Sequence, residues 1–258
     1  MTIIDAHVHV GSWSHADFLG RGATLDQTLA VMTASGVQGC AIMPTDRCDN
    51  AGLLAEAAAA AGRGVALWFI AWVRPAEVGA AGGVGRADLD WVEAHRGQMT
   101  GIKIHPSLSR MRVTDDGFAP ALDLAEARDL VVVVHCGRWQ EMASYRFAVE
   151  AARRHPRARF LLAHAGGDTP PLATAAAELV RDERVDNVWF DFAGLREHWV
   201  VERNVALIGA ERYLMGSDFN LAHPLMYIGA VRGMRLGDEQ RARILGENAR
   251  ALLGEPLR

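Results

Sequence analysis

The sequence predicts one (β/α)8 barrel, and three observations agree on that fold. The chain of 258 residues is long for a single sandwich or helix bundle and suits one α/β barrel. Short apolar segments alternate along it with segments that have helical spacing. Polar residues interrupt the apolar segments near their carboxyl ends, where barrel enzymes place their sites. We therefore expect a single domain over residues 1–258, without a linker.

Eight apolar segments are expected to form the strands, and they begin about 30 residues apart, as a repeated βα unit requires. The segment 130–137 contains four consecutive valines, which is typical of a strand buried on both faces. The expected strands are residues 3–10, 37–43, 65–73, 100–106, 130–137, 159–164, 187–194 and 212–218.

Each expected strand is followed by a segment with the marks of a helix. Thr24-Leu25-Asp26-Gln27 has the pattern of a capping box at the start of the first helix, and Gly36 follows its end. Pro170 and Pro171 stand in the first turn of another helix, where proline is tolerated. The expected helices are residues 24–35, 49–61, 88–95, 120–129, 139–154, 170–182, 197–208 and 238–253.

A doubly wound open sheet is the alternative arrangement of alternating strands and helices. No Gly-x-Gly-x-x-Gly motif follows any expected strand, so dinucleotide binding has little support. The glycine-rich stretch 79–85 is expected to be a loop, and it lacks the Lys-Ser or Lys-Thr pair of a phosphate-binding loop. The barrel is therefore the better interpretation.

The composition favours a protein with a small-molecule partner. The formal net charge of −4 and the pI near 6.2 show no basic excess that would indicate nucleic-acid binding. The longest apolar runs, 65–73 and 130–134, are shorter than the roughly 20 residues that span a bilayer, and no secretory signal is visible. The 3 cysteines lack the spacing of a disulfide framework or zinc knuckle. We expect a cytoplasmic protein with a small-molecule substrate and no nucleic-acid or membrane partner, and a homo-oligomer is compatible with the sequence.

The first expected strand ends in His7-Val8-His9. Side chains two residues apart in a strand point to the same face, so these two imidazoles can reach one metal ion. An isolated His-x-His pair is equally compatible with two ordinary half-buried histidines. The decision between the two explanations therefore depends on the other strand ends.

Further polar residues stand at the ends of later strands, and their types suit a metal site. Imidazoles and a carboxylate are ligands for zinc and, less selectively, for manganese or iron. With one position open to water, such a site is catalytic, and Asp218 is placed to take a proton from that water. The polar residues at later strand ends are Lys103, His105, His135, His164, Asp191 and Asp218.

Five ordered motifs in the sequence resemble the amidohydrolase superfamily. More narrowly, they resemble its branch of small metal-dependent hydrolases and decarboxylases, the amidohydrolase-related or amidohydrolase 2 family. The resemblance covers nearly the whole chain and does not specify a substrate. The motifs are Asp5-Ala6-His7-Val8-His9, Gly101-Ile102-Lys103-Ile104-His105-Pro106, His135-Cys136-Gly137, His164-Ala165-Gly166-Gly167 and Gly216-Ser217-Asp218.

The resemblance implies that His7, His9, His135 and Asp218 bind a metal, most often zinc. It also implies that His164 either binds a second metal or orients water or substrate.

Lys103 is the ambiguous position of the resemblance. A lysine there is carboxylated and bridges two metals in binuclear relatives, whereas a similar Lys-x-His-Pro segment occurs with a single metal in the smaller branch. We favour one zinc ion. With one metal, Lys103 would be a cation near the substrate carboxylate or the partner of an acid such as Asp191.

Other residues are candidates for substrate binding. His105 stands two residues after Lys103, and Arg74, Arg138 and Trp139 follow other strands. Arginine matches a carboxylate with two parallel hydrogen bonds, so the two arginines could clamp an anionic substrate. A surface salt bridge or a packed tryptophan explains these residues equally well.

We expect a metal-dependent hydrolase that directs an activated water at an ester, lactone or amide carbonyl, with Asp218 carrying the proton and His164 or the metal stabilising the oxyanion. The alternative is a decarboxylase that uses the same metal site to hold an aromatic or unsaturated acid. A third interpretation is a barrel that only binds a ligand.

Overall fold

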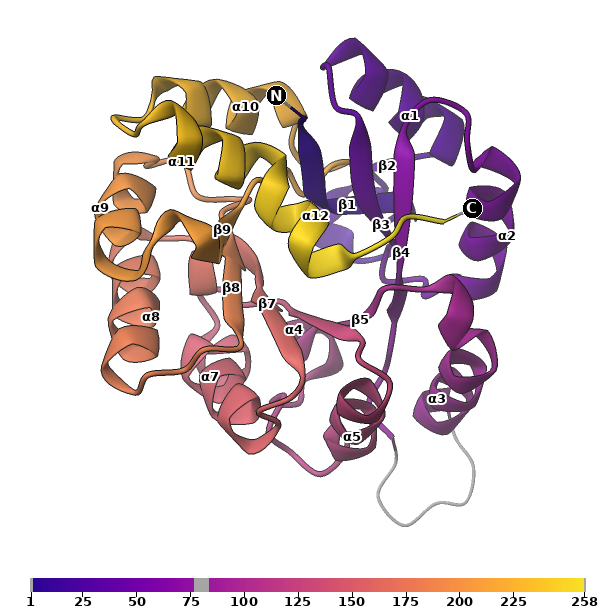
Figure 1. The fold of residues 1–258 in the computed structure, drawn as a ribbon. Helices are drawn as coiled ribbons and strands as arrows, with labels where there is room; N and C mark the ends of the chain where they lie inside the picture. Colours follow the sequence, from indigo (N-terminus) through magenta and orange to yellow (C-terminus); the bar gives the residue numbers. More distant parts are fainter. Residues whose placement is uncertain (1, 77–83, 258) are drawn as a thin grey trace.

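The alternating apolar segments form one curled sheet of nine strands, described for residues 2–76 and 84–257 by a computed structural model (Figure 1). The strand order is β2-β1-β3-β4-β5-β6-β7-β8-β9; β2 is antiparallel to β1, and the other pairs are parallel. The strands are β1 Ile4–Ser12, β2 Gly22–Ala23, β3 Gly39–Pro44, β4 Ala66–Trp72, β5 Gly101–Ile104, β6 Val131–Val134, β7 Arg159–Leu162, β8 Val188–Asp191 and β9 Tyr213–Leu214.

The sheet closes on itself between β1 and the segment that follows β9. Ala6 N donates to Met215 O at 2.9 Å, and Val8 forms a parallel bridge with Phe219. Closure leaves no free edge between the first and last parallel strands. The predicted (β/α)8 barrel is confirmed.

Helices surround the barrel on the outside (Figure 1). The helices are α1 Leu25–Ala34, α2 Asn50–Ala60, α3 Val84–His95, α4 Pro106–Ser109, α5 Ala119–Ala127, α6 Gln140–Ala143, α7 Tyr145–Arg154, α8 Pro170–Asp182, α9 Trp199–Ile208, α10 Pro224–Gly233, α11 Asp238–Ala242 and α12 Asn248–Leu253. Shorter helical turns cover Ala16–Phe18, Arg96–Gln98, Ala163–Gly166, Ala210–Arg212 and Arg243–Glu247.

The capping box predicted at the start of α1 is present. Thr24 Oγ1 accepts from Gln27 N at 3.2 Å, and Gln27 Oε1 accepts from Thr24 N at 2.9 Å. Two unpaired donors at the helix start are satisfied in this way, which fixes where α1 begins.

Two predicted helices differ in the structure. The segment 139–154 is divided at Ser144, whose extended backbone ends α6 and whose Oγ caps α7. The segment 238–253 contains a π-helical turn, Arg243–Glu247, between α11 and α12.

Other expectations need smaller corrections. The ninth strand is only two residues long, so residues 215–218 do not continue it as predicted. The helix α10 and the short strand β2 were not predicted. Within the glycine-rich stretch, residues 79–83 lie outside the described residues, and Gly85 is part of α3.

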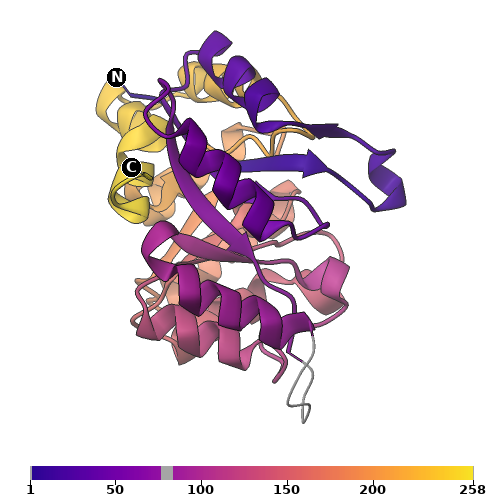
Figure 2. The same ribbon diagram turned by 90° about the vertical axis from the view of Figure 1, so that its right-hand side faces the viewer.

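One end of the barrel is closed by apolar side chains and α12. In Figure 1 this helix crosses in front of the strands, and in Figure 2 both termini lie on the side opposite to the tip of β1. Leu252 and Leu253 of α12 join a cluster that fills the barrel interior, and Trp68 Nε1 donates to Gly254 O at 2.9 Å. The opposite end of the barrel, at the carboxyl ends of the strands, is not filled by this cluster and carries polar side chains.

In the part of the chain that the structure describes, no helix combines the length and the hydropathy needed to cross a membrane.

Candidate metal centre

A register shift in β1 directs both histidines of the first strand into the barrel. The pairing of β1 with β3 shifts between Asp5 and Val8. Ala6 belongs to the apolar interior cluster, and His7 and His9 both line the pocket above it. Because of this irregularity, two consecutive residues, Ala6 and His7, face inward.

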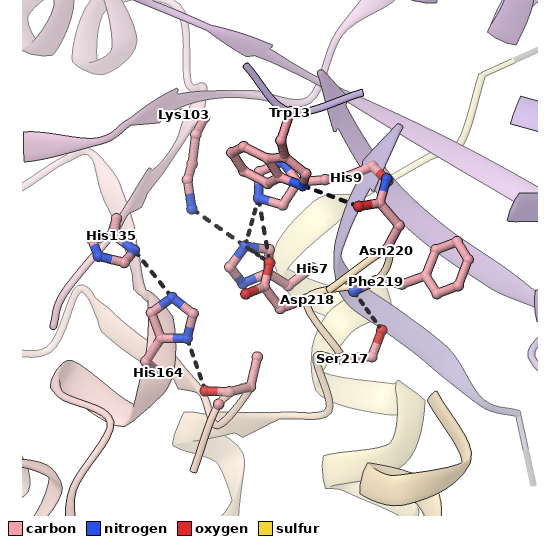
Figure 3. Close-up of polar contacts among 12 residues, drawn as sticks. His7, His9, Trp13, Lys103, His135, His164, Ser217, Asp218, Phe219 and Asn220 are labelled. Atoms are coloured by element: carbon pink, nitrogen blue, oxygen red, sulfur yellow. Dashed lines mark hydrogen bonds and ion pairs between the residues drawn. The ribbon is translucent and has the colours of Figure 1, made fainter. Parts of the chain in front are cut away.

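His7, His9 and Asp218 form a cluster whose ligand atoms lie within 4.8 Å of one another (Figure 3). The two Nε2 atoms are 3.2 Å apart, and Asp218 Oδ1 lies 3.6 Å from His7 Nε2 and 3.5 Å from His9 Nε2. Asp218 N donates to His7 O at 2.8 Å, which fixes the carboxylate beside β1. Within the described residues this is the one group of three or more ligand side chains at such distances.

The partners of the two histidines orient their lone pairs toward this cluster. His9 Nδ1 donates to Pro44 O at 2.9 Å, and His7 Nδ1 donates to Asp191 Oδ2 at 3.1 Å. The proton of each neutral ring is therefore on Nδ1, and each Nε2 carries a lone pair. Such partners are the usual way in which metal-binding histidines are oriented.

The clustered atoms, two imidazole nitrogens and a carboxylate oxygen, are all acceptors. A metal fits such a cluster only if these atoms are not already used by protein donors. Among residues 2–76 and 84–257, no N–H or O–H group donates to His9 Nε2 or to the Asp218 carboxylate. Burial lowers the pKa values of His7 and His9 well below 6.5, so both are neutral, as ligands must be. Two lone pairs and a carboxylate that converge in this way fit a divalent cation.

Lys103 extends from β5 into the same cluster (Figure 3). It is fully buried, and its Nζ donates to His7 Nε2 at 3.3 Å. Burial lowers the pKa of Lys103, while the charges of Asp218 and Asp191 raise it. Lys103 therefore lies beside the cluster, and its role as a metal bridge, a substrate cation or the partner of an acid stays a prediction.

The pKa values of two carboxyl groups are raised: that of the buried Asp5 and that of the partly exposed Asp218 of the cluster. Burial raises the pKa values of Asp5 and Asp218 to about 7, against the lowering effect of hydrogen bonds from Ser217 and His7 on Asp5 and of the Lys103 charge on Asp218. Asp5 Oδ1 accepts from Ser217 N at 2.9 Å and from His7 N at 3.2 Å. Asp5 therefore ties the histidine strand to the segment that carries Asp218.

His135 and His164 form a separate pair beside the cluster. His164 Nε2 lies 3.1 Å from His135 Nδ1, and His164 Nδ1 donates to Ala193 O at 2.8 Å. His135 is not among the three clustered ligand residues, so the structure does not bring this predicted fourth ligand together with the others. Its role as a metal ligand stays a prediction.

Asp191 connects the two histidine groups, a role that its position at a strand end only suggested. Oδ2 accepts from His7 Nδ1, and Oδ1 accepts from His164 N at 3.1 Å and from Ala193 N at 3.1 Å. The carboxylate is fully buried. The Asp191 carboxylate therefore orients the His7 ring of the cluster and fixes the backbone of His164.

The cluster, Lys103 and the His135–His164 pair line a pocket of about 310 Å³ at the carboxyl ends of the strands. Arg138 and Trp139 are at its wall, and Arg138 Nε donates to Asp168 Oδ2 at 2.7 Å. Trp13 was not predicted; it follows β1, packs 4.7 Å from the His9 ring and donates from Nε1 to Asn220 Oδ1 at 3.0 Å. The lining includes His7, His9, Trp13, Phe18, Lys103, His105, His135, Arg138, Trp139, His164, Asp168 and Asp218.

Arg74, a predicted substrate ligand, is not among the lining residues. Its Nε and Nη2 donate to the two oxygens of Asp88 at 2.8 and 2.6 Å. This salt bridge occupies the Nε and Nη2 edge of the guanidinium, an edge that could otherwise bind a substrate carboxylate with two parallel hydrogen bonds. The structure therefore explains Arg74 by the alternative that the sequence left open, a salt bridge.

The model of the amidohydrolase family matches residues 4–254. The chain belongs to the amidohydrolase family. The family depends on metal ions, and His7, His9 and Asp218 form a candidate metal site in this pocket. No curated protein sequence matches the chain significantly.

Solved structures of amidohydrolases share the fold at low sequence identity. The 5-carboxyvanillate decarboxylase from Sphingomonas paucimobilis superposes with a TM-score of 0.74 at 16% identity, covering 98% of each chain. An amidohydrolase from Burkholderia multivorans with bound zinc gives 0.73 at 18% identity, covering 99% of this chain and 100% of that one. A putative 2-pyrone-4,6-dicarboxylic acid hydrolase from Pseudomonas putida gives 0.71 at 18%, covering 98% and 97%. The relatives include both hydrolases and decarboxylases.

Proposed function

We propose that this chain is a zinc-dependent hydrolase that cleaves an ester, lactone or amide bond in a small molecule bearing a carboxylate. The observation that carries the proposal is the cluster of acceptors: two Nε2 lone pairs 3.2 Å apart with the Asp218 carboxylate 3.5 to 3.6 Å from them. One cluster of this kind among the described residues supports one metal rather than two.

His7, His9 and Asp218 would hold the metal. A bound divalent metal supplies Lewis acidity, which acidifies a water molecule and polarises a substrate carbonyl. Asp191 and Pro44 keep the two rings in the tautomer that such a site needs.

Asp218 is the carboxylate of the cluster that faces the pocket, with its side chain 16% exposed, whereas Asp191 is fully buried. Asp218 is therefore placed to accept a proton from water and to pass it to the leaving group. His164, which also lines the pocket, and the buried Lys103 would stabilise negative charge on the substrate.

Decarboxylation is the second candidate function, favoured by the similarity to 5-carboxyvanillate decarboxylase. In that reaction Lys103 and Arg138 would hold the carboxylate that is lost, and Asp218 would protonate the carbon. The same pocket would serve both reactions.

The test combines metal content with two product assays. We expect purified protein to contain one zinc per chain and to hydrolyse members of a panel of lactones and esters of aromatic carboxylic acids, with incorporation of ¹⁸O from labelled water. Release of carbon dioxide from carboxylated aromatics without ¹⁸O incorporation would establish the decarboxylase instead. Protein that contains no metal and turns over none of these substrates would support the third interpretation, a barrel that only binds a ligand.

A matched pair of variants tests the metal ligands. His9→Ala removes a clustered Nε2 and should abolish stoichiometric zinc. His198→Ala removes an exposed histidine whose side chain makes no capping hydrogen bond, and it should retain zinc. Equal zinc content in both variants would contradict the proposed site.

A further inference from the structure

Five histidines line the pocket, and the protein fixes the position of the ring proton in each of them. Their partners decide which nitrogen donates and which accepts. For His7 and His9, the partners described above place the proton on Nδ1 and the lone pair on Nε2. The other three are His105, His135 and His164.

His164 and His135 also present lone pairs. His164 Nδ1 donates to Ala193 O, so its Nε2 accepts, and the hydrogen bond at 3.1 Å must come from His135 Nδ1 (Figure 3). With its proton on Nδ1, neutral His135 carries its lone pair on Nε2. Four of the five pocket imidazoles are therefore acceptors at Nε2.

His105 has the opposite polarity. It is the N-cap residue of α4, and its Nδ1 accepts from Leu108 N at 3.3 Å. A backbone N–H can only donate, so Nδ1 is unprotonated and the ring proton is on Nε2. The His105-Pro106 sequence, with proline at the first helical position, is the signal from which this cap could have been predicted.

The ring of His105 is held in a fixed plane at the pocket. It stacks on Trp72 at 5.4 Å with an interplanar angle of 11° and on His135 at 3.8 Å with an angle of 12°. It lines the pocket and is 7% exposed. In the part of the chain that the structure describes, no protein group accepts a hydrogen bond from its Nε2.

We propose that His105 is a catalytic residue whose Nε2–H donates a hydrogen bond to a negatively charged oxygen of the substrate. This inference rests on the proposed function and adds to it. The Nε2 lone pairs of His9 and His135 repel such an oxygen unless a metal covers them, and those of His7 and His164 already accept from Lys103 Nζ and His135 Nδ1. Among the five imidazoles, only the N–H of His105 attracts it. A donor already oriented by a stack and a cap needs little reorganisation when charge develops.

The charged oxygen is either a carboxylate of the substrate or the oxyanion that develops in the transition state. The two differ in kinetics, because a contact made only in the transition state affects kcat and a contact made equally in the ground state affects KM. The same variants therefore distinguish the two sources.

The tautomer is tested first, without any substrate. In long-range ¹H–¹⁵N spectra of ¹⁵N-histidine-labelled, zinc-loaded protein, we expect one pocket histidine with the proton on Nε2, and its signal should be lost in His105→Asn. Addition of benzoate up to 100 mM should move this Nε2–H signal downfield. An Nδ1–H tautomer for His105, or a signal that benzoate leaves unchanged, would overturn the proposal, whether or not the protein proves to be a hydrolase.

Two variants separate the donor from the structural roles of the ring. His105→Asn retains an acceptor for Leu108 N but has no donor that reaches the position of Nε2, and it should lower kcat/KM by about 10²- to 10³-fold, as removal of one oxyanion donor does. His105→Gln supplies an amide N–H near the position of Nε2 and should recover about tenfold of that loss. Both variants should keep wild-type zinc content, and because both lose the same stacked ring, their melting temperatures should be alike. Equal activity of the two variants would assign the ring a structural role and refute the proposal.

Discussion

The two ends of the barrel are built from the same strands and differ in chemistry. At the closed end, Val131 and Val133 of β6 join the apolar interior cluster with α12. Two residues further along the same face, His135 lines the pocket. In β8, Trp189 packs at the interior and Asp191 follows it at the site. Residues that stabilise the barrel and residues that line the site therefore occupy successive positions on one inward face, and we expect that each group can be changed without affecting the other.

The largest loss of activity is expected from a substitution at the polar end of the barrel, where the pocket lies. Asp218→Asn should lower kcat/KM by about 10²- to 10⁴-fold, the usual contribution of a general acid or base, and should weaken zinc binding by a smaller factor. Steady-state kinetics and zinc titration of the same preparation measure the two losses. Asp90→Asn, on the exposed side of α3, is the control and should change neither. Turnover close to wild type would exclude Asp218 as the proton carrier.

The apolar end should respond in stability. Trp68→Ala removes a fully buried ring that closes the barrel against Gly254, and it should lower the free energy of unfolding by about 3–5 kcal/mol. Zinc affinity of the folded fraction should stay within about twofold, because the site lies at the other end. Urea unfolding and zinc titration are the measurements. Trp199→Ala, at a tryptophan 54% exposed, should change stability little. A large loss of zinc affinity in Trp68→Ala would show that the two ends are coupled.

Asp191 lies between the apolar interior and the pocket, and a substitution there tests whether its charge supports metal binding. Asp191→Asn retains an oxygen acceptor for the backbone N–H groups of His164 and Ala193 but removes the charge beside His7. Zinc affinity should fall about 10- to 100-fold, as it does when an outer partner of a metal-binding histidine is changed. Competition with a fluorescent chelator measures the affinity, and Asp186→Asn, at an exposed aspartate, is the control. An unchanged dissociation constant would mean that Asp191 is needed only for the backbone.

The smallest effect separates the two predicted substrate arginines. Arg138→Ala should raise KM about tenfold, because Arg138 lines the pocket and keeps donors beyond its bond to Asp168. Arg74→Ala should leave kcat/KM within about twofold, because Asp88 engages that guanidinium outside the pocket lining. Kinetics with one substrate compare the two. If Arg74→Ala has the larger effect on KM, the assignment of the pocket wall is wrong.

The sequence by itself determined the fold and most of the polar end. Apolar segments and helix caps are local patterns, so the barrel and the capping box at Thr24 could be read from neighbouring residues. The strand period placed His7 and His9 on one face, and Asp218 was recognised from its position at the end of the last expected strand and from its motif. Five separate motifs indicated the family before any contact was known.

Only the tertiary structure decided how these residues meet. The register shift in β1 depends on pairing with β3, and the engagement of Arg74 depends on Asp88, 14 residues away. The proton of His7 is placed by Asp191, 184 residues away in sequence. A residue type states what a side chain can donate or accept, but its partners, which come from other strands, decide which atom faces the pocket. The sequence could therefore identify most of the residues of the site, and the folded barrel decided which nitrogen of each histidine donates and which accepts.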